Sequence, residues 1–181
     1  MVHVIEVRVL PADRLSAIAE IDRSEHIDTI FEVRAGNLSS RAVDIDVPRW
    51  NLEGVDPHSV GAFRDDLAPI LERGATLLGA FDGDDVVGVA IVEGRFDGDM
   101  AWLAFLHVSR TYRRLGVGSA LWAEAIDLAR MAGARSIYVS ATPSGSAVGF
   151  YLARGCKVVT VPNDELYAAE PEDVHMVAII D

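Results

Sequence analysis

The chain has 181 residues, half of them hydrophobic, which is enough for one compact domain with a sizeable core. Its net charge of −12, from 16 basic and 28 acidic residues, argues against a nucleic-acid partner, because a duplex binder presents a basic face. The sequence also lacks both a secretory N-terminus and an apolar run of the roughly 20 residues that cross a membrane.

The first part of the chain predicts one strand and two helices, with a long irregular stretch between the helices. Alternation over 2–10 predicts the strand, and helical spacing after Pro11 predicts a helix from Ala12 to about Ile27. The pattern fades from 28 to 57, and a stretch that long inside a compact domain is usually functional or mobile. A second helix is expected over 58–73, where Pro69 introduces a kink.

Further along, the pattern changes to strands separated by short turns. An acidic turn over 82–85 lacks the spacing and terminal Glu of a calcium loop, so it predicts a hairpin, as does 97–99. The five histidines are scattered, so no metal site is expected. The single cysteine, Cys156, excludes an intrachain disulfide and suits a reducing cytoplasm, where we expect the protein. The predicted strands are 76–81, 86–92, 101–109, 136–142, 156–161 and 174–180, with a short helix over 146–154.

The most informative segment joins the strand at 101–109 to a helix that ends at Gly133. Glycines let a backbone approach a ligand closely, and the free N–H groups of a first helical turn favour an anion, above all a phosphate. Two arginines add positive charge. We therefore predict that this loop holds a pyrophosphate. Its residues are Arg113, Arg114, Leu115, Gly116, Val117, Gly118, Ser119 and Ala120.

Three kinds of phosphate loop compete for this segment. A Walker loop needs a Lys, and none occurs here; a dinucleotide fingerprint needs a third glycine, where this chain has Leu121. The third pattern, Arg/Gln-x-x-Gly-x-Gly/Ala, is met at every specified position by Arg113 to Gly118. In this feature the chain resembles the GNAT superfamily of acyl-coenzyme A N-acyltransferases.

A second motif extends the resemblance. The superfamily has a helix of the form Asn-x-x-Ala-x-x-Phe-Tyr, and Ser144, Ala147, Phe150 and Tyr151 fall on that spacing, with Ser144 where Asn is usual. The similarity covers residues 101–161, about a third of the chain.

The resemblance implies an α/β fold with a central mixed, mostly antiparallel twisted sheet. Six to seven strands would be flanked by about four helices and splayed between the fourth and fifth strands. The pantetheine arm of acetyl-CoA would insert at the splay, against backbone groups of Leu106, His107 and Val108, much like an added strand. Residues 113–120 would hold the pyrophosphate, with Ser144, Ala147 and Phe150 also at the coenzyme. Residues 1–181 would form one domain, with 11–74 on the acceptor side and 101–161 as the acetyl-CoA core.

The implied activity is transfer of an acetyl group from acetyl-CoA to a primary amine, by direct attack in a ternary complex. Tyr151 would be the general acid that protonates the departing thiolate. Many relatives carry a glutamate base on the fourth strand where this chain has Trp102, so that assignment fails. Alternation turns the His107 side chain away from the face of Leu106 and Val108, which favours a packing role. The candidate bases are Glu20, Asp22, Glu25 and Glu93.

Other functions stay open from the sequence. The chain could be a non-catalytic or regulatory coenzyme A-binding domain, or a transferase that uses another acyl-CoA. Its oligomeric state, a homodimer included, is also open. Carboxylates of the N-terminal part could attract a cationic amine to the cleft, or serve solubility alone. They are Asp22, Glu25, Asp28, Glu32, Asp44 and Asp46.

Overall fold

The computed structural model describes residues 4–54, 56 and 59–180. The strands of this described part are β1 (Ile5–Leu10), β2 (Glu25–Arg34), β3 (Asn37–Val47), β4 (Thr76–Asp82), β5 (Asp85–Asp97), β6 (Met100–Val108), β7 (Ser136–Ala141), β8 (Lys157–Val158) and β9 (Val174–Ile179). The 3₁₀ helices are η1 (Ala12–Glu20) and η2 (Arg110–Tyr112), and the α-helices are α1 (Val60–Glu72), α2 (Val117–Met131), α3 (Gly145–Leu152) and α4 (Asp164–Ala169).

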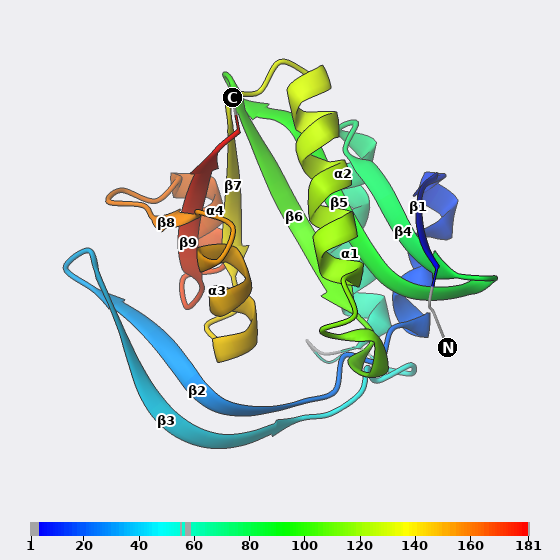
Figure 1. Cartoon of the computed structure of the whole chain (residues 1–181), viewed down its shortest axis with the longest axis horizontal. Coiled ribbons are helices and arrows are strands. Elements are labelled where there is room, and N and C mark those ends of the chain that lie inside the picture. Colours follow the sequence, from blue (N-terminus) through cyan, green and yellow to red (C-terminus); the bar gives the residue numbers. More distant parts are fainter. Residues whose placement is uncertain (1–3, 55, 57–58, 181) are drawn as a thin grey trace.

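Seven of the described strands form one twisted sheet in the order β1-β4-β5-β6-β7-β9-β8, and β2 and β3 form a separate hairpin (Figure 1). Among these strands, β6 and β7 are the one parallel pair, so the sheet is mixed and mostly antiparallel. Side chains of α2 and α3 pack on one face of the sheet, and side chains of η1, α1 and α4 pack on the other. The predicted α/β architecture is confirmed.

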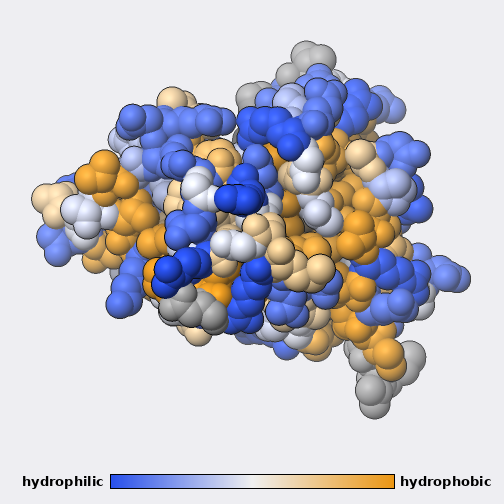
Figure 2. Space-filling model, turned by 90° about the horizontal axis from the view of Figure 1, so that it is seen from above, coloured by the Kyte–Doolittle hydropathy of each residue, from blue (hydrophilic) through white to orange (hydrophobic). Residues whose placement is uncertain are grey.

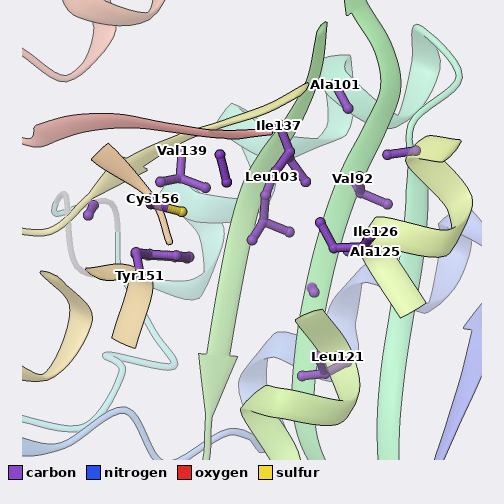
Figure 3. Packing of buried hydrophobic residues seen from close by; sticks show 14 of the residues in the cluster. Val92, Ala101, Leu103, Leu121, Ala125, Ile126, Ile137, Val139, Tyr151 and Cys156 are labelled. Atoms are coloured by element: carbon purple, nitrogen blue, oxygen red, sulfur yellow. The ribbon is translucent and has the colours of Figure 1, made fainter. Parts of the chain in front are cut away.

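Helix α2 lies against the sheet because its small and apolar residues recur at helical spacing. Leu121, Ala125 and Ala129 are fully buried on its inner face, and Figure 3 shows Leu121 and Ala125 close to β5 and β6. Gly88 of β5 lets the helix come this close, since a Cβ there would lie 2.9 Å from Val117. The predicted helix end at Gly133 is confirmed, because this residue has φ 88° and the Ala134 N–H donates to the Ala129 carbonyl.

Cys156 follows α3 and lies in the same core. Its side chain is 3% exposed, and Figure 3 shows it beside Tyr151 and Val139. Burial raises the pKa of the Cys156 thiol to about 11, so the thiol stays protonated at neutral pH.

The helix predicted from Ala12 to Ile27 is wrong beyond Glu20. The 3₁₀ helix η1 ends there, because Ile21 takes an extended conformation and Asp22 then accepts hydrogen bonds from Ser24. Most of the stretch expected to be irregular, 28–57, belongs instead to the β2–β3 hairpin.

The hairpin was not predicted from the sequence, for two physical reasons. Its turn is Ala35-Gly36, both at positive φ (50° and 76°), and alanine is an unusual residue in that conformation. In addition, most of its side chains are exposed or half-buried, so no buried face imposes a clear alternation of apolar and polar residues.

Smaller differences concern other element boundaries. Helix α1 continues through Pro69, β8 covers only Lys157–Val158 of the predicted 156–161, and α4 was not predicted although Asn163 caps it. The acidic turns at 82–85 and 97–99 are hairpin turns as predicted. The predicted starts of the first strand at Val2 and of the second helix at His58 lie outside the described residues.

The surface is mixed in character. Figure 2 shows hydrophilic residues over much of the face seen from above, interrupted by hydrophobic areas. Exposed apolar side chains come from several elements and include Val9, Met131 and Ile179. In the described ranges, no helix is long and apolar enough to cross a membrane, and no group of three His, Cys, Asp or Glu is arranged to hold a metal ion.

Candidate active site

The sheet opens between β6 and β7. These strands pair only through Met100–Leu103 and Ser136–Val139, after which β6 continues to Val108 without β7 beside it (Figure 1). The register with β5 skips one residue at Ala104, and such a β-bulge bends the strand. Because β6 and β7 are the fourth and fifth strands in sheet order, the splay lies where the family resemblance places it.

Two backbone positions of β6 face this gap. The Ser109 N–H donates to the Val87 carbonyl of β5 at 2.9 Å. Backbone groups of successive strand residues point to opposite sides, so His107, paired with Val89, also bonds toward β5. The polar backbone groups of Leu106 and Val108 therefore point into the gap. Of the three predicted pantetheine contacts, these two direct their backbone groups into the gap, where the Val108 carbonyl already accepts from Arg113 Nε, and His107 does not.

The N-terminus of α2 lies at the open end of the same gap. Gly116 precedes the helix at φ 89°, and Ala120 is the first residue whose N–H bonds back to the Gly116 carbonyl. The N–H groups of Val117, Gly118 and Ser119 thus have no acceptor within the helix. Such a helix start favours a phosphate.

Gly118 is required here for packing as well. A Cβ at this position would lie 2.9 Å from Cε2 of Phe150, so the helix N-terminus and α3 come together only with glycine. Leu115 is 49% exposed and contributes little to the core.

The three arginines near this helix start behave differently. Arg113 directs its guanidinium inward, where Nε donates to the Val108 carbonyl at 3.1 Å. Arg114 is exposed and has no side-chain partner within the described ranges. Arg154, which the sequence analysis did not select, donates to Ser119 Oγ at 2.7 Å and stacks 3.3 Å above the Phe150 ring. Its spacing of four residues from Phe150 could have indicated in the sequence that the two side chains are in contact.

Helix α3 brings the second motif to the gap. Ser144 is its N-cap and accepts from the Ala147 N–H at 3.2 Å, and serine, like asparagine, is a favoured N-cap residue. Phe150 packs edge-on against Tyr151, with ring centroids 5.1 Å apart. In Figure 3 the Tyr151 ring extends from α3 in the direction of β6.

Tyr151 is suited to donate a proton. It is 8% exposed, and burial, helped by the nearby Cys156, Asp173 and Glu170, raises the pKa of its hydroxyl above the ordinary value of about 10. The hydroxyl therefore carries its proton throughout the neutral range, which is the state that a general acid needs.

The predicted bases are engaged in other contacts. Glu93 pairs with Arg73 at 3.1 Å and lies about 10 Å along β5 from the level of Leu106. Asp22 pairs with Arg49 at 2.8 Å, and Glu25 faces Arg113 at 3.7 Å. Burial opposes ionisation of Asp22, but hydrogen bonds from Ser24 outweigh it and lower the pKa. Glu20, on η1, is exposed near Arg14.

His107 lies on the opposite face of the sheet from α2, among aromatic rings. Its imidazole is 4.7 Å from the Phe105 ring and 5.5 Å from the Trp50 ring. Burial, with Arg23 and Arg113 nearby, lowers the pKa of His107 to about 4. The ring is therefore neutral at physiological pH and has the packing role that alternation indicated.

A cavity of about 610 Å³ separates the β2–β3 hairpin from the segment that runs from β8 to β9. On the hairpin side, Glu32 is already neutralised by Arg34 at 2.7 Å and Arg41 at 3.1 Å. The opposite wall carries carboxylates and aromatic groups with no arginine or lysine among them. The residues of this wall with polar side chains are Thr160, Asp164, Tyr167, Glu172, Asp173 and His175.

His175 fixes the shape of that wall. Its Nε2 lies 2.9 Å from the Glu170 carbonyl and must donate to it, so Nδ1 accepts from the Tyr138 hydroxyl at 2.9 Å. The same hydroxyl accepts from the Asn163 N–H, which begins α4. Burial lowers the pKa of His175, consistent with the neutral ring that this network requires.

Asp173 on the same wall gives the fold a predicted pH dependence. Burial and the neighbouring Glu170 raise its pKa from 3.8 to about 7. Because the folded state holds this proton more tightly than the unfolded state, stability falls as pH rises from about 4 to 7 and stays lower above. Asp173→Asn should therefore raise the free energy of unfolding by roughly 1–3 kcal/mol at pH 8, and much less at pH 4.

Denaturant unfolding at both pH values measures this effect. Asp164→Asn, an exposed carboxylate of the same wall, is the matched control and should change stability little at either pH. An equal gain for Asp173→Asn at pH 4 and pH 8 would show that the carboxyl does not titrate as described.

The comparisons with known proteins agree with this geometry. Residues 23–156 match the model of the acetyltransferase (GNAT) family, and the chain belongs to that family. No curated protein matches the sequence significantly.

Solved structures share the fold. Nourseothricin acetyltransferase has 22% identity, a TM-score of 0.72, and coverage of 98% of this chain and 99% of its own. A streptothricin acetyltransferase candidate from Bacillus anthracis str. Ames, in complex with acetyl coenzyme A, has 19% identity, a TM-score of 0.63 and complete coverage of both chains. PaiA N-acetyltransferase from Thermoplasma acidophilum, in complex with coenzyme A, has 17% identity, a TM-score of 0.61, and covers 97% of this chain and 99% of its own.

Proposed function

We propose that this protein transfers the acetyl group of acetyl-CoA to a primary amine. The observation that carries the proposal is that three features border the β6–β7 gap. They are the backbone groups of Leu106 and Val108, the uncapped N–H groups that follow Gly116, and the protonated Tyr151. A thioester arm, a pyrophosphate and a leaving thiolate would each find a suitable partner there.

The reaction needs no further cofactor. The amine nitrogen attacks the thioester carbonyl carbon, the carbon–sulfur bond breaks, and the thiolate takes the Tyr151 proton. The nitrogen loses its extra proton to water or to a carboxylate. Since Asp22, Glu25 and Glu93 all have arginine partners, we propose a route through water in preference to direct transfer to one of them.

The charge around the cavity supports an amine that carries additional positive charge. Of the N-terminal carboxylates named from the sequence, Asp22, Glu25 and Glu32 pair with arginines. Among the described carboxylates that line the cavity, Asp164 and Glu172 are exposed and form no ion pair, and both lie across the cavity from the hairpin. They would attract a cation by long-range steering.

A coupled binding and turnover experiment tests the function. Acetyl-CoA should raise the melting temperature, and a panel of amines should then release free thiol, with di- and polycationic amines ahead of neutral and acidic ones. The double variant Asp164→Asn/Glu172→Gln should raise KM for the best amine by roughly 3–10-fold and leave the Kd of acetyl-CoA unchanged. Asp13→Asn on η1 is the control for removal of a carboxylate outside the cavity lining.

The outcomes separate the alternatives. Stabilisation by acetyl-CoA without thiol release from any amine would favour a regulatory coenzyme-binding domain. Faster release from another acyl-CoA would keep the transferase and change its donor. A preference for acidic acceptors would contradict the role of the acidic wall.

A further inference from the structure

Arg113 connects the coenzyme loop to the β2–β3 hairpin. Besides its bond to the Val108 carbonyl, its Nη2 donates to the Arg23 carbonyl at 3.1 Å, and its Nη1 lies 3.7 Å from the Glu25 carboxylate. The Arg113 and Glu25 side chains are only 28% and 23% exposed. The donors of this guanidinium are thus directed to protein groups at the end of β6 and at or just before the start of β2.

Two backbone contacts join the same segments. The Arg110 N–H donates to the Asp22 carbonyl at 2.9 Å, and the Asp22 N–H donates to Ser109 Oγ at 3.0 Å. The residues that precede α2 and the residues that begin the hairpin therefore form one connected unit.

Further along, β2 contacts the segment that begins α3. The Phe31 N–H donates to the Pro143 carbonyl at 2.7 Å, Ile30 forms a bridge with Ser144, and Thr29 lies against Gly145. Strand β2 thus passes from the end of β6 to the N-terminus of the helix that carries Tyr151. In Figure 1 the hairpin crosses below the open end of the splay.

Besides these contacts, the hairpin packs the side chains of Phe31 and Leu38 against the core. Strands β2 and β3 pair with each other and not with the main sheet, and isolated two-stranded hairpins are marginally stable. Its order therefore depends on contacts with the rest of the chain, among them those at 22–25 and at 29–31. A ligand that stiffens the loop before α2 would also stiffen the hairpin.

We propose that Arg113 is a positioning residue that couples coenzyme binding to the order of the hairpin, while the exposed Arg114 interacts with the phosphate. The inference rests on the proposed binding of coenzyme A. It assigns different roles to the two adjacent arginines, and the phosphate contact goes to Arg114, which occupies an unspecified position of the loop motif.

Amide hydrogen exchange with and without saturating coenzyme A tests this role and needs no acceptor. In the wild type, coenzyme A should slow exchange over residues 25–47 by about fivefold or more. Arg113→Met should abolish that protection while changing the Kd of coenzyme A by less than about threefold. Arg114→Asn, chosen because Asn tolerates the positive φ of 65°, should weaken coenzyme binding and keep the protection at saturation.

A second variant guards against misfolding of Arg113→Met. Glu25→Gln removes only the ion pair, and it should reduce the hairpin protection with the coenzyme Kd unchanged. If Arg113→Met weakens coenzyme binding as much as Arg114→Asn and retains protection, Arg113 is a phosphate ligand and the inference is wrong. Binding without any change in hairpin exchange in the wild type also overturns it but leaves the proposed function intact, whereas an absence of coenzyme binding overturns both.

Discussion

Tyr151→Phe should lower kcat by ~10²–10⁴-fold, the usual contribution of a general acid. The variant removes only a hydroxyl whose proton is retained throughout the neutral range, and it keeps the ring that packs against Phe150 and Trp122. Because the hydroxyl acts in the chemical step alone, the Kd of acetyl-CoA should stay within about twofold of the wild type. Steady-state kinetics and calorimetric titration measure the two quantities separately.

Tyr112→Phe provides the matched control. The Tyr112 hydroxyl bonds to Asp82 at 3.0 Å, on the other side of α2 from α3, and its loss should leave kcat nearly unchanged. If Tyr151→Phe turns over at the wild-type rate, Tyr151 is not the general acid and has a purely structural role in the core.

Gly118→Val should abolish the stabilisation by acetyl-CoA and, with it, activity. The new side chain would occupy the approach to the N–H groups of the first turn of α2, and its Cβ would also press on the Phe150 ring. Either effect removes the phosphate site, so the shift in melting temperature should fall to near zero.

A double variant distinguishes the two causes. Gly118→Val/Phe150→Ala relieves the contact with the ring and leaves the obstruction at the helix N-terminus. Continued loss of binding supports the phosphate site, and recovery of binding assigns the defect to packing. Gly149→Ala, where a Cβ meets no atom within 4 Å, is the control for a glycine replacement in the neighbouring helix.

The sequence predicted well those helices and strands that bury one face against the core. Helix α2 and strands β4 to β7 carry apolar residues at regular spacing because each packs on the core, and their positions were predicted to within a few residues. The β2–β3 hairpin carries no such face. Its pairing depends on a turn at Ala35-Gly36 and on contacts with residues more than a hundred positions away, such as Ile30 with Ser144.

The candidate site also has features that the sequence predicted and features that it did not. Backbone features, such as the glycines at the N-terminus of α2 and the N-cap of α3, follow from local sequence and lie where the motifs indicated. Side-chain direction does not follow from spacing. Arg113 and Arg114 are adjacent in the loop motif, yet one points to Val108 and the other to solvent, while Arg154 reaches Ser119 from the turn that follows α3.

The burial of Cys156 allows a thiol reagent to follow both turnover and unfolding of the protein. It is the one cysteine of the chain, and its thiol is both inaccessible and protonated at neutral pH. A thiol reagent should therefore not react with the folded enzyme, and it should detect only the coenzyme thiol released by turnover. When the same reagent is added without substrates, the appearance of one reactive thiol per chain should report global unfolding, since exposure of Cys156 requires opening of the core around Tyr151 and Val139.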